Sequence, residues 1–253
     1  MSLQEEQARR LAKIRALLAK AEDEAVTAPE AEALSAKAAE LMGKYSIDQA
    51  MIDAAAKVSD PGKAKGTPGR RRVIFFTGQD FIGHKMDLLH AVALHNGCST
   101  VVTSATGPQP RSYVFGYESD LDLTEMLFTS LVLQAAHALL AEDVPFGDTP
   151  RSFNSAWWAA YTNKIAYRLS NLRWAAERDA EKAAPGTALV LKDRKAVVAA
   201  MVKEEFPDTR KVSRGSGGKS RAGRAAGYAA GGRATLGTAA GIGGGSASRA
   251  IER

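Results

Sequence analysis

The cationic residues that give this chain its net charge of +6 are concentrated at its C-terminal end. Residues 210–253 contain nine Lys and Arg against one acidic residue, and they hold 12 of the 23 glycines. Residues 1–209 are close to neutral. Because a segment with few large apolar residues cannot bury enough surface to offset its ordering entropy, we expect residues 210–253 to form a flexible basic tail rich in Gly and Ala. The packed core must then come from residues 1–209.

The composition is that of a globular protein with one large or two small domains, because 45% of the 253 residues are hydrophobic and 25% are charged. No run of about 18 apolar residues occurs, so we expect no transmembrane helix and no membrane partner. The first residues lack the basic and then apolar pattern of a secretory signal. Cys98 is the only cysteine, which excludes an internal disulfide and a cysteine-based zinc site. These features predict a cytoplasmic protein.

Residues 1–57 predict a helical hairpin. Apolar side chains recur at spacings of three and four over residues 3–21 and again over residues 34–45, and residues 47–56 predict a short third helix. Each apolar stripe needs a partner to cover it, so the helices should pack against one another. This segment carries a net charge of −2, which argues against DNA binding by the hairpin itself and makes it a candidate surface for a protein partner.

Three motifs in this segment resemble a known family. They are KIRALLAKAE from Lys13 to Glu22, EAEA from Glu30 to Ala33, and AELMGKYSID from Ala39 to Asp48. Over about the first 50 residues the chain resembles the bacterial and phage family catalogued as domain of unknown function 2786. The stretch GYAAG from Gly227 to Gly231 is similar to longer actinobacterial and actinophage members. The resemblance implies a phage or actinobacterial setting, and it assigns no activity and no functional residues.

Residues 58–72 predict a linker, because two prolines, three glycines and five cations cannot support a packed element. Beyond it, residues 73–209 predict a small mixed α+β domain in which helices surround a few strands, without repeated βαβ units. The strand patterns cover residues 73–77, 99–103, 112–116 and 188–191. The helix patterns cover residues 81–96, 121–141, 149–181 and 194–206, and residues 220–230 could add a helix that would need a partner.

The patterns that would indicate an enzyme are weak. His84 and Asp87 could share a helix face, and acidic residues gather near Asp120, so a metal-dependent hydrolase with a site near these three residues is one alternative. Acids at the start of a helix also stabilise its dipole without any catalytic role. No pair of histidines has the spacing of a zinc site. We therefore expect no metal and no cofactor, and we favour a protein without enzymatic activity.

The basic tail is the strongest functional signal. Cations spaced among small residues can follow a phosphate backbone closely, with little sequence preference. Trp158 is displaced by 100° from the apolar stripe of its predicted helix, so we expect it to be exposed for base contact. We predict a nucleic-acid-associated protein of phage or bacterial DNA metabolism, and the alternatives are the hydrolase above and an adaptor that binds a protein through residues 1–57. The predicted nucleic-acid contacts are Arg210, Lys211, Arg214, Lys219, Arg221, Arg224 and Arg233, with Arg70, Arg71, Arg72 and Trp158 as further contacts.

Overall fold

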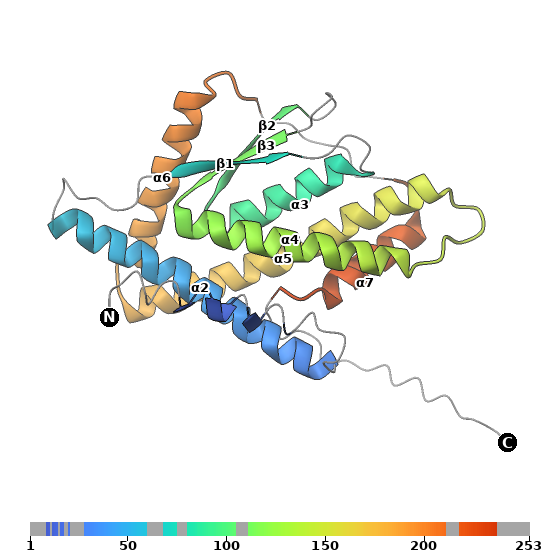
Figure 1. The fold of residues 1–253 in the computed structure, drawn as a ribbon, viewed down its shortest axis with the longest axis horizontal. Coiled ribbons are helices and arrows are strands. Elements are labelled where there is room, and N and C mark those ends of the chain that lie inside the picture. The colour runs from blue at the N-terminus through green and yellow to red at the C-terminus, as the bar shows by residue number, and fades with distance from the viewer. Residues whose placement is uncertain are drawn as a thin grey trace.

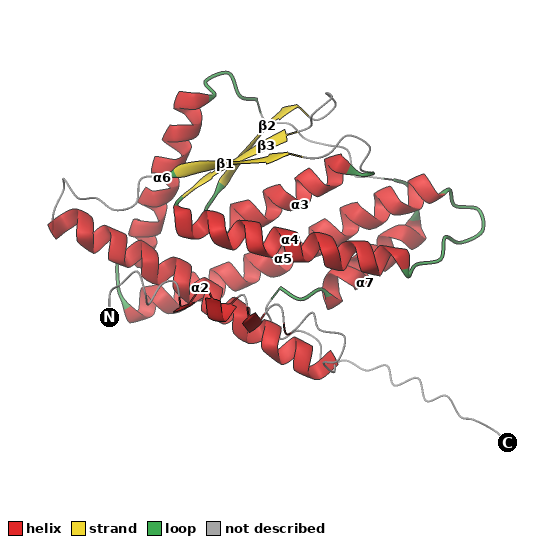
Figure 2. Cartoon of the chain, in the orientation of Figure 1, coloured by secondary structure: helices red, strands yellow, loops and turns green. Residues whose placement is uncertain are grey.

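The computed structural model describes residues 9–10, 12–14, 16–17, 20, 28–59, 68–74, 80–104, 111–210 and 218–236. Helices form most of this part of the chain, and a small sheet covers one side of them (Figures 1 and 2). The elements are α2 (Ala28–Ser59), β1 (Gly69–Ile74), α3 (Ile82–His95), β2 (Ser99–Ser104), β3 (Arg111–Gly116), α4 (Glu118–Leu140), α5 (Pro150–Ala183), α6 (Thr187–Glu205) and α7 (Arg221–Arg233). This arrangement agrees with the predicted α+β class.

The sheet has three antiparallel strands in the order β1-β3-β2. The two strand patterns predicted at residues 99–103 and 112–116 are confirmed as the paired strands β2 and β3. At the ends of the predicted linker, residues 58–59 belong to α2 and residues 69–72 to β1, and residues 60–67 lie outside the described part. Arginines are compatible with β1 because it is an edge strand.

Helix α5 is the centre of the main core. Its buried side chains Trp157, Tyr161 and Ile165 pack in one cluster with residues of α3 and α4, among them Leu88 and Leu127. Burial of this apolar stripe is the main stabilising term for such a long helix. The N-terminus of α5 is fixed by Thr149, whose hydroxyl accepts a hydrogen bond from the Ser152 amide.

The prediction that Trp158 is exposed is wrong, since its side chain is only 3% exposed. Its ring packs edge-on against Trp157 and Tyr161. A displacement of 100° leads to exposure only on a helix that buries a single stripe. In the structure α5 contacts α3, α4 and α7, so a wider arc of its surface is covered.

The N-terminal region packs as a helical pair. Among residues 9–20, those that the structure describes are helical, and Ile14 is fully buried beside Ala38 and Met42 of α2. Arg10 pairs with Asp48 at 2.9 Å. The break expected between the second and third helices is absent, because α2 continues through Ser59. Since α2 also packs against α4, α5 and α6, the N-terminal segment lies on the main body of the fold.

Two further predictions need correction. Residues 188–191, expected as a strand, belong to α6, where Leu191 and Val198 are buried two turns apart. Residues 218–236 of the expected flexible tail are folded, and α7 packs along α5. Glycines at the contact allow this, because they let the two helix backbones approach closely. Residues 211–217 and 237–253 lie outside the described part.

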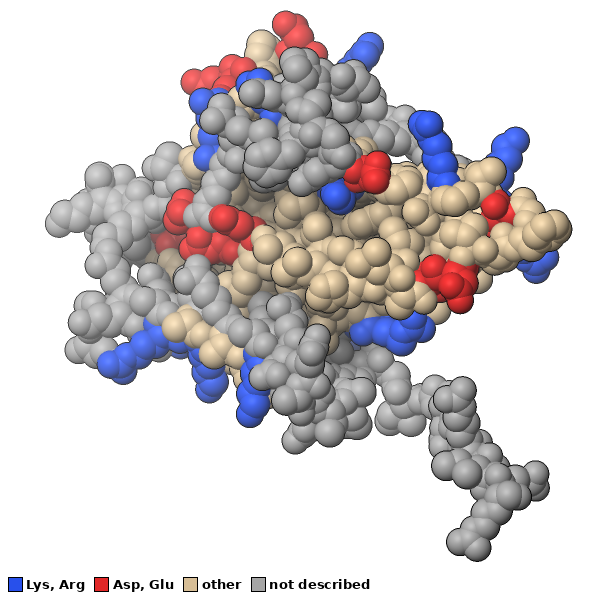
Figure 3. Space-filling model, turned by 45° about the vertical axis from the view of Figure 1, so that its right-hand side comes forward, with Lys and Arg blue, Asp and Glu red and all other residues tan. Residues whose placement is uncertain are grey.

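Within the described residues, α4 is the one helix whose length and composition would allow it to cross a membrane. Leu123, Leu127 and Leu131 of α4 pack in the main core, as in an ordinary core helix. Its other side is apolar and partly open, with Leu133 and Leu140 exposed. Figure 3 shows a broad surface formed by uncharged residues. Most of the Lys, Arg, Asp and Glu residues in this view lie around its edges.

Candidate functional site

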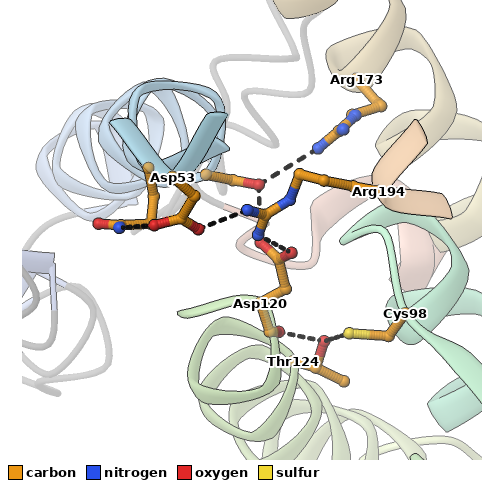
Figure 4. A network of polar contacts seen from close by, with 8 residues as sticks. Asp53, Cys98, Asp120, Thr124, Arg173 and Arg194 are labelled. Atoms are coloured by element: carbon orange, nitrogen blue, oxygen red, sulfur yellow. Dashed lines mark hydrogen bonds and ion pairs between the residues drawn. The ribbon is translucent and has the colours of Figure 1, made fainter. Parts of the chain in front are cut away.

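An ion-pair network that is largely shielded from solvent joins three helices (Figure 4). Arg194 of α6 contacts Asp53 of α2 at 2.6 Å and Asp120 of α4 at 3.1 Å. The Arg194 guanidinium also lies over the Tyr117 ring, 3.6 Å from its centroid. One cation thus holds two carboxylates from distant parts of the sequence.

Further hydrogen bonds surround Asp120. Ser46 donates to one of its carboxylate oxygens at 2.9 Å, and Arg173 of α5 donates to Ser46 at 3.5 Å. The Thr124 hydroxyl donates to the Asp120 carbonyl at 2.7 Å and lies 3.6 Å from the Cys98 sulfur. Burial raises the pKa of Asp120, and Arg194 opposes this effect by favouring the charged form. The network satisfies Asp120 internally, so its evident role is to hold the helices together.

The structure separates Asp120 from the other two residues of the predicted hydrolase site, His84 and Asp87. His84 lies in the first turn of α3, and its Nε2 is 2.9 Å from the Ser155 hydroxyl of α5. Asp120 lies beside Gly97, just beyond the other end of α3. The length of α3 places these two positions roughly 15 Å apart. Asp87 is on α3, one turn after His84. Within the described residues, no three His, Cys, Asp or Glu side chains are grouped so as to hold a metal ion.

A pocket of about 410 Å³ opens beside the network, between the end of α3 and helices α5 and α6. Arg173 contacts Glu177 at 2.5 Å, and Lys195 contacts the same carboxylate at 3.7 Å. Burial lowers the pKa of His95, and the positive charges of Arg173 and Lys195 lower it further. The lining residues are Leu94, His95, Gly97, Cys98, Ser99, Ser170, Arg173, Trp174, Glu177 and Lys195.

A second polar surface lies where α7 packs on α5, and we call it the α5–α7 face. The Lys164 ammonium lies 4.4 Å from the centroid of the Tyr228 ring and 5.5 Å from that of the Tyr167 ring, and it donates to the Tyr228 hydroxyl at 3.1 Å. Tyr167 is 60% exposed and Tyr228 is 53% exposed. The face consists of Lys164 and Tyr167 from α5 with Arg221, Arg224 and Tyr228 from α7.

The termini of α7 are fixed by side chains. At its N-terminus the Ser220 hydroxyl accepts from the Gly223 amide at 2.8 Å and donates to Asp148 at 2.6 Å. At its C-terminus the buried Arg168 donates to the carbonyls of Gly231 and Ala234, at 2.7 and 2.6 Å. Arg168 therefore satisfies carbonyls that the helix end would leave unpaired.

The predicted nucleic-acid contacts are only partly on this face. Arg221 and Arg224 are exposed on α7, and within the described residues neither is paired with a carboxylate. Arg70 lies in β1, paired with Glu205 and stacked over Tyr113. Of the other predicted cations, Arg210, Lys219 and Arg233 are exposed, whereas Lys211, Arg214 and the side chains of Arg71 and Arg72 lie outside the described part.

Tyr167, Tyr228 and the pocket are not among the sites that the sequence predicts. The sequence does contain a pattern that points to Tyr228. Gly223, Gly227 and Gly231 recur every four residues, as on the packed side of a helix, and this spacing leaves Arg224 and Tyr228 on another side. No comparable signal existed for the pocket, since its residues come from α3, β2, α5 and α6 and converge only through the fold.

The fold and these sites define a helical α+β protein with a small antiparallel sheet. Residues 9–49 match the family model described as a protein of unknown function, DUF2786, which confirms the resemblance drawn from the N-terminal motifs. The matched segment covers the first described residues and most of α2. No curated protein and no solved structure matches the chain.

Proposed function

We propose that this chain is a nucleic-acid-binding protein without enzymatic activity, and that it binds the polynucleotide through the α5–α7 face. The observation that carries the proposal is Lys164, whose ammonium lies over the rings of Tyr167 and Tyr228, both more than half exposed. Exposed aromatic rings beside cations are the usual means of stacking bases while neutralising phosphates. The family resemblance suggests a phage or actinobacterial setting, and the role in phage or bacterial DNA metabolism is part of this proposal.

Part of the predicted basic tail is the folded helix α7, so two of its cations have fixed positions. Arg221 and Arg224 are fixed one turn apart on a helix, so their positions relative to Tyr228 are set before binding. Preorganised cations lose less conformational entropy on binding than cations of a flexible chain. The expected specificity is low, because phosphate contacts position a protein on nucleic acid without reading sequence.

The test is a salt titration of binding by the full chain to a fluorescent single strand and to the corresponding duplex. The double variant Arg221→Gln/Arg224→Gln should weaken binding and reduce the slope of log K against log salt by about 0.7–0.9 for each lost phosphate contact. The matched control is Lys192→Gln/Lys203→Gln, which removes two exposed cations from α6 and should leave the slope unchanged. Equal slopes for both double variants would overturn the proposal.

A second pair of variants tests the aromatic residues. Tyr167→Ala/Tyr228→Ala should weaken binding to a single strand by about 1–3 kcal/mol for each stacked base that is lost. Phe146→Ala is the control, because Phe146 is a fully exposed aromatic residue in the loop between α4 and α5. The alternative function, an adaptor that binds a protein through residues 1–57, remains a separate prediction.

A further inference from the structure

We propose that the pocket between α3, α5 and α6 binds one unpaired nucleotide, with its base on Trp174 and its phosphate on Lys195 and Arg173. The inference deepens the proposed function and rests on it for the nature of the ligand. It adds a second binding site for the polynucleotide. It also predicts a preference for single strands over duplexes, because a base can reach Trp174 only when it is free of a duplex stack.

Trp174 supplies the aromatic surface of the pocket. Its side chain is 63% exposed, whereas the other two tryptophans, Trp157 and Trp158, are buried. The Arg178 guanidinium lies over one face of the Trp174 ring, 4.7 Å from its centroid, so one side of this ring already stacks on a cation and a ligand would use the other. A large exposed aromatic ring at the rim of a polar pocket favours a flat ligand that stacks on it.

The pocket lies in line with the α5–α7 face. Tyr167 and Trp174 are seven residues apart on α5, which places them two helical turns apart on the same side, at a separation of roughly 10 Å. Ser170, which lines the pocket, lies between them on this exposed stripe. A single strand that stacks on Tyr167 and Tyr228 can therefore continue along α5 toward the pocket.

The charges of the pocket favour an anion. Arg173 and Lys195 share the single carboxylate of Glu177, which leaves an excess of one positive charge. The Lys195 contact is the long one, at 3.7 Å, and its side chain is 54% exposed, whereas Arg173 is held at 2.5 Å and is 14% exposed. Lys195 is thus the cation that can turn from Glu177 to a phosphate at little cost.

The size and the remaining groups fit one nucleotide. A volume of about 410 Å³ lies within the range of small-molecule pockets, at its lower end. The hydroxyls of Ser99 and Ser170 and the ring of His95 supply hydrogen-bonding groups at the wall. Because inorganic phosphate has no base to stack on Trp174, it should bind much more weakly than a nucleotide.

The test uses adenosine 5′-monophosphate and inorganic phosphate as probes, with the full chain and its tryptophan fluorescence as the readout. The nucleotide should quench the exposed Trp174, and Trp174→Phe should remove this response. Lys195→Gln should weaken nucleotide binding about tenfold or more, because it deletes a charge-assisted contact. Glu177→Gln should strengthen binding, because it removes the carboxylate that competes for Lys195. Lys192→Gln, an exposed change on the same helix, is the control.

Opposite effects of Lys195→Gln and Glu177→Gln on nucleotide affinity would support the pocket. Equal affinity of the unaltered chain and Lys195→Gln, no nucleotide binding at all, or phosphate binding as tight as nucleotide binding would each overturn it. Oligonucleotide binding that depends on Tyr228 without any nucleotide response would overturn the pocket and keep the proposed function. A nucleotide response without oligonucleotide binding would keep the pocket and overturn the proposed function.

Discussion

Gly227 of α7 lies directly against the main chain of Trp157 in α5. A Cβ placed at Gly227 would overlap the Trp157 carbonyl oxygen, and one at Gly223 would overlap the Phe153 carbonyl oxygen. The two glycines are four residues apart, so they form a smooth strip along one side of α7 that matches successive turns of α5. The glycines of this segment therefore act as a packing surface, and the exposed cations of α7 depend on it for their position.

Gly227→Ala should destabilise the protein by about 1–3 kcal/mol, because the added methyl group has no space between the helices. Gly232→Ala is the matched control, since a Cβ there would lie 3.8 Å from the Lys164 side chain, an ordinary contact. That control should be neutral or stabilise by up to about 1 kcal/mol through helix propensity. The measurement is the free energy of unfolding of both variants in urea. Similar values would show that the close contact with Trp157 contributes little to stability.

Arg194→Met should cost about 3–5 kcal/mol of folding free energy, because it leaves the buried carboxylate of Asp120 and the partly buried carboxylate of Asp53 without their cation. The comparison is Arg178→Met, which removes an exposed pair with Asp179 and should cost less than about 1 kcal/mol. Thermal and urea unfolding of the two variants measure the difference. Equal losses would contradict a structural role of the network.

His95 predicts a specific pH dependence of stability. Its pKa in the folded protein is below the ordinary value of 6.5, because of its burial and the charges of Arg173, Lys195 and His90, which face it together with Glu177. The unfolded chain therefore binds a proton more readily just below pH 6.5. Stability should fall as the pH falls through this window and rise as the pH rises through it.

His95→Gln should remove that part of the pH dependence. The measurement is the free energy of unfolding in urea at several values between about pH 5 and pH 8, where an ordinary histidine titrates. His137→Gln, an exposed change near the end of α4, is the control. An unchanged slope in His95→Gln would show that other groups set the acid sensitivity.

The sequence predicted those elements whose pattern is local. The helices α3, α4 and α5 show apolar spacings of three and four. Strand β2 is rich in β-branched residues, β3 contains Tyr, Val and Phe, and the sequence between them contains Gly and Pro. The strand prediction for the short apolar run at residues 188–191 is wrong, because periodicity cannot separate a short strand from part of a buried helix. Its true state follows from Leu191 and Val198, which are buried two turns apart.

The sequence could not predict the ion-pair network for a different reason, which is the distance along the chain between its residues. Asp120 lies 74 residues from both Ser46 and Arg194, and Asp53 lies 141 residues from Arg194. No spacing rule links such positions, since only the packed helices bring them together. The glycines of α7 were interpreted from composition alone, which emphasises their entropy and misses their four-residue spacing.

Trp158 and Tyr228 should respond to substitution in opposite ways. Trp158→Ala should cost about 3–5 kcal/mol of stability, because the ring is buried against Trp157 and Tyr161, and the folded protein should still bind nucleic acid with unchanged affinity. Tyr228→Ala should change stability by no more than about 0.5 kcal/mol, because the ring is on the surface. Its effect should instead be on binding, where the loss of a stacking ring beside Lys164 weakens affinity for a single strand.

The measurement combines urea unfolding with fluorescence anisotropy of a labelled single strand at a temperature where both variants are folded. The anisotropy is compared at one fixed salt concentration, because the electrostatic part of the affinity depends steeply on salt. If Trp158→Ala weakened binding while Tyr228→Ala left it unchanged, the binding surface would lie elsewhere on the molecule. The expected pattern, stability lost in one variant and affinity lost in the other, follows from which ring the fold buries and which it leaves in contact with solvent.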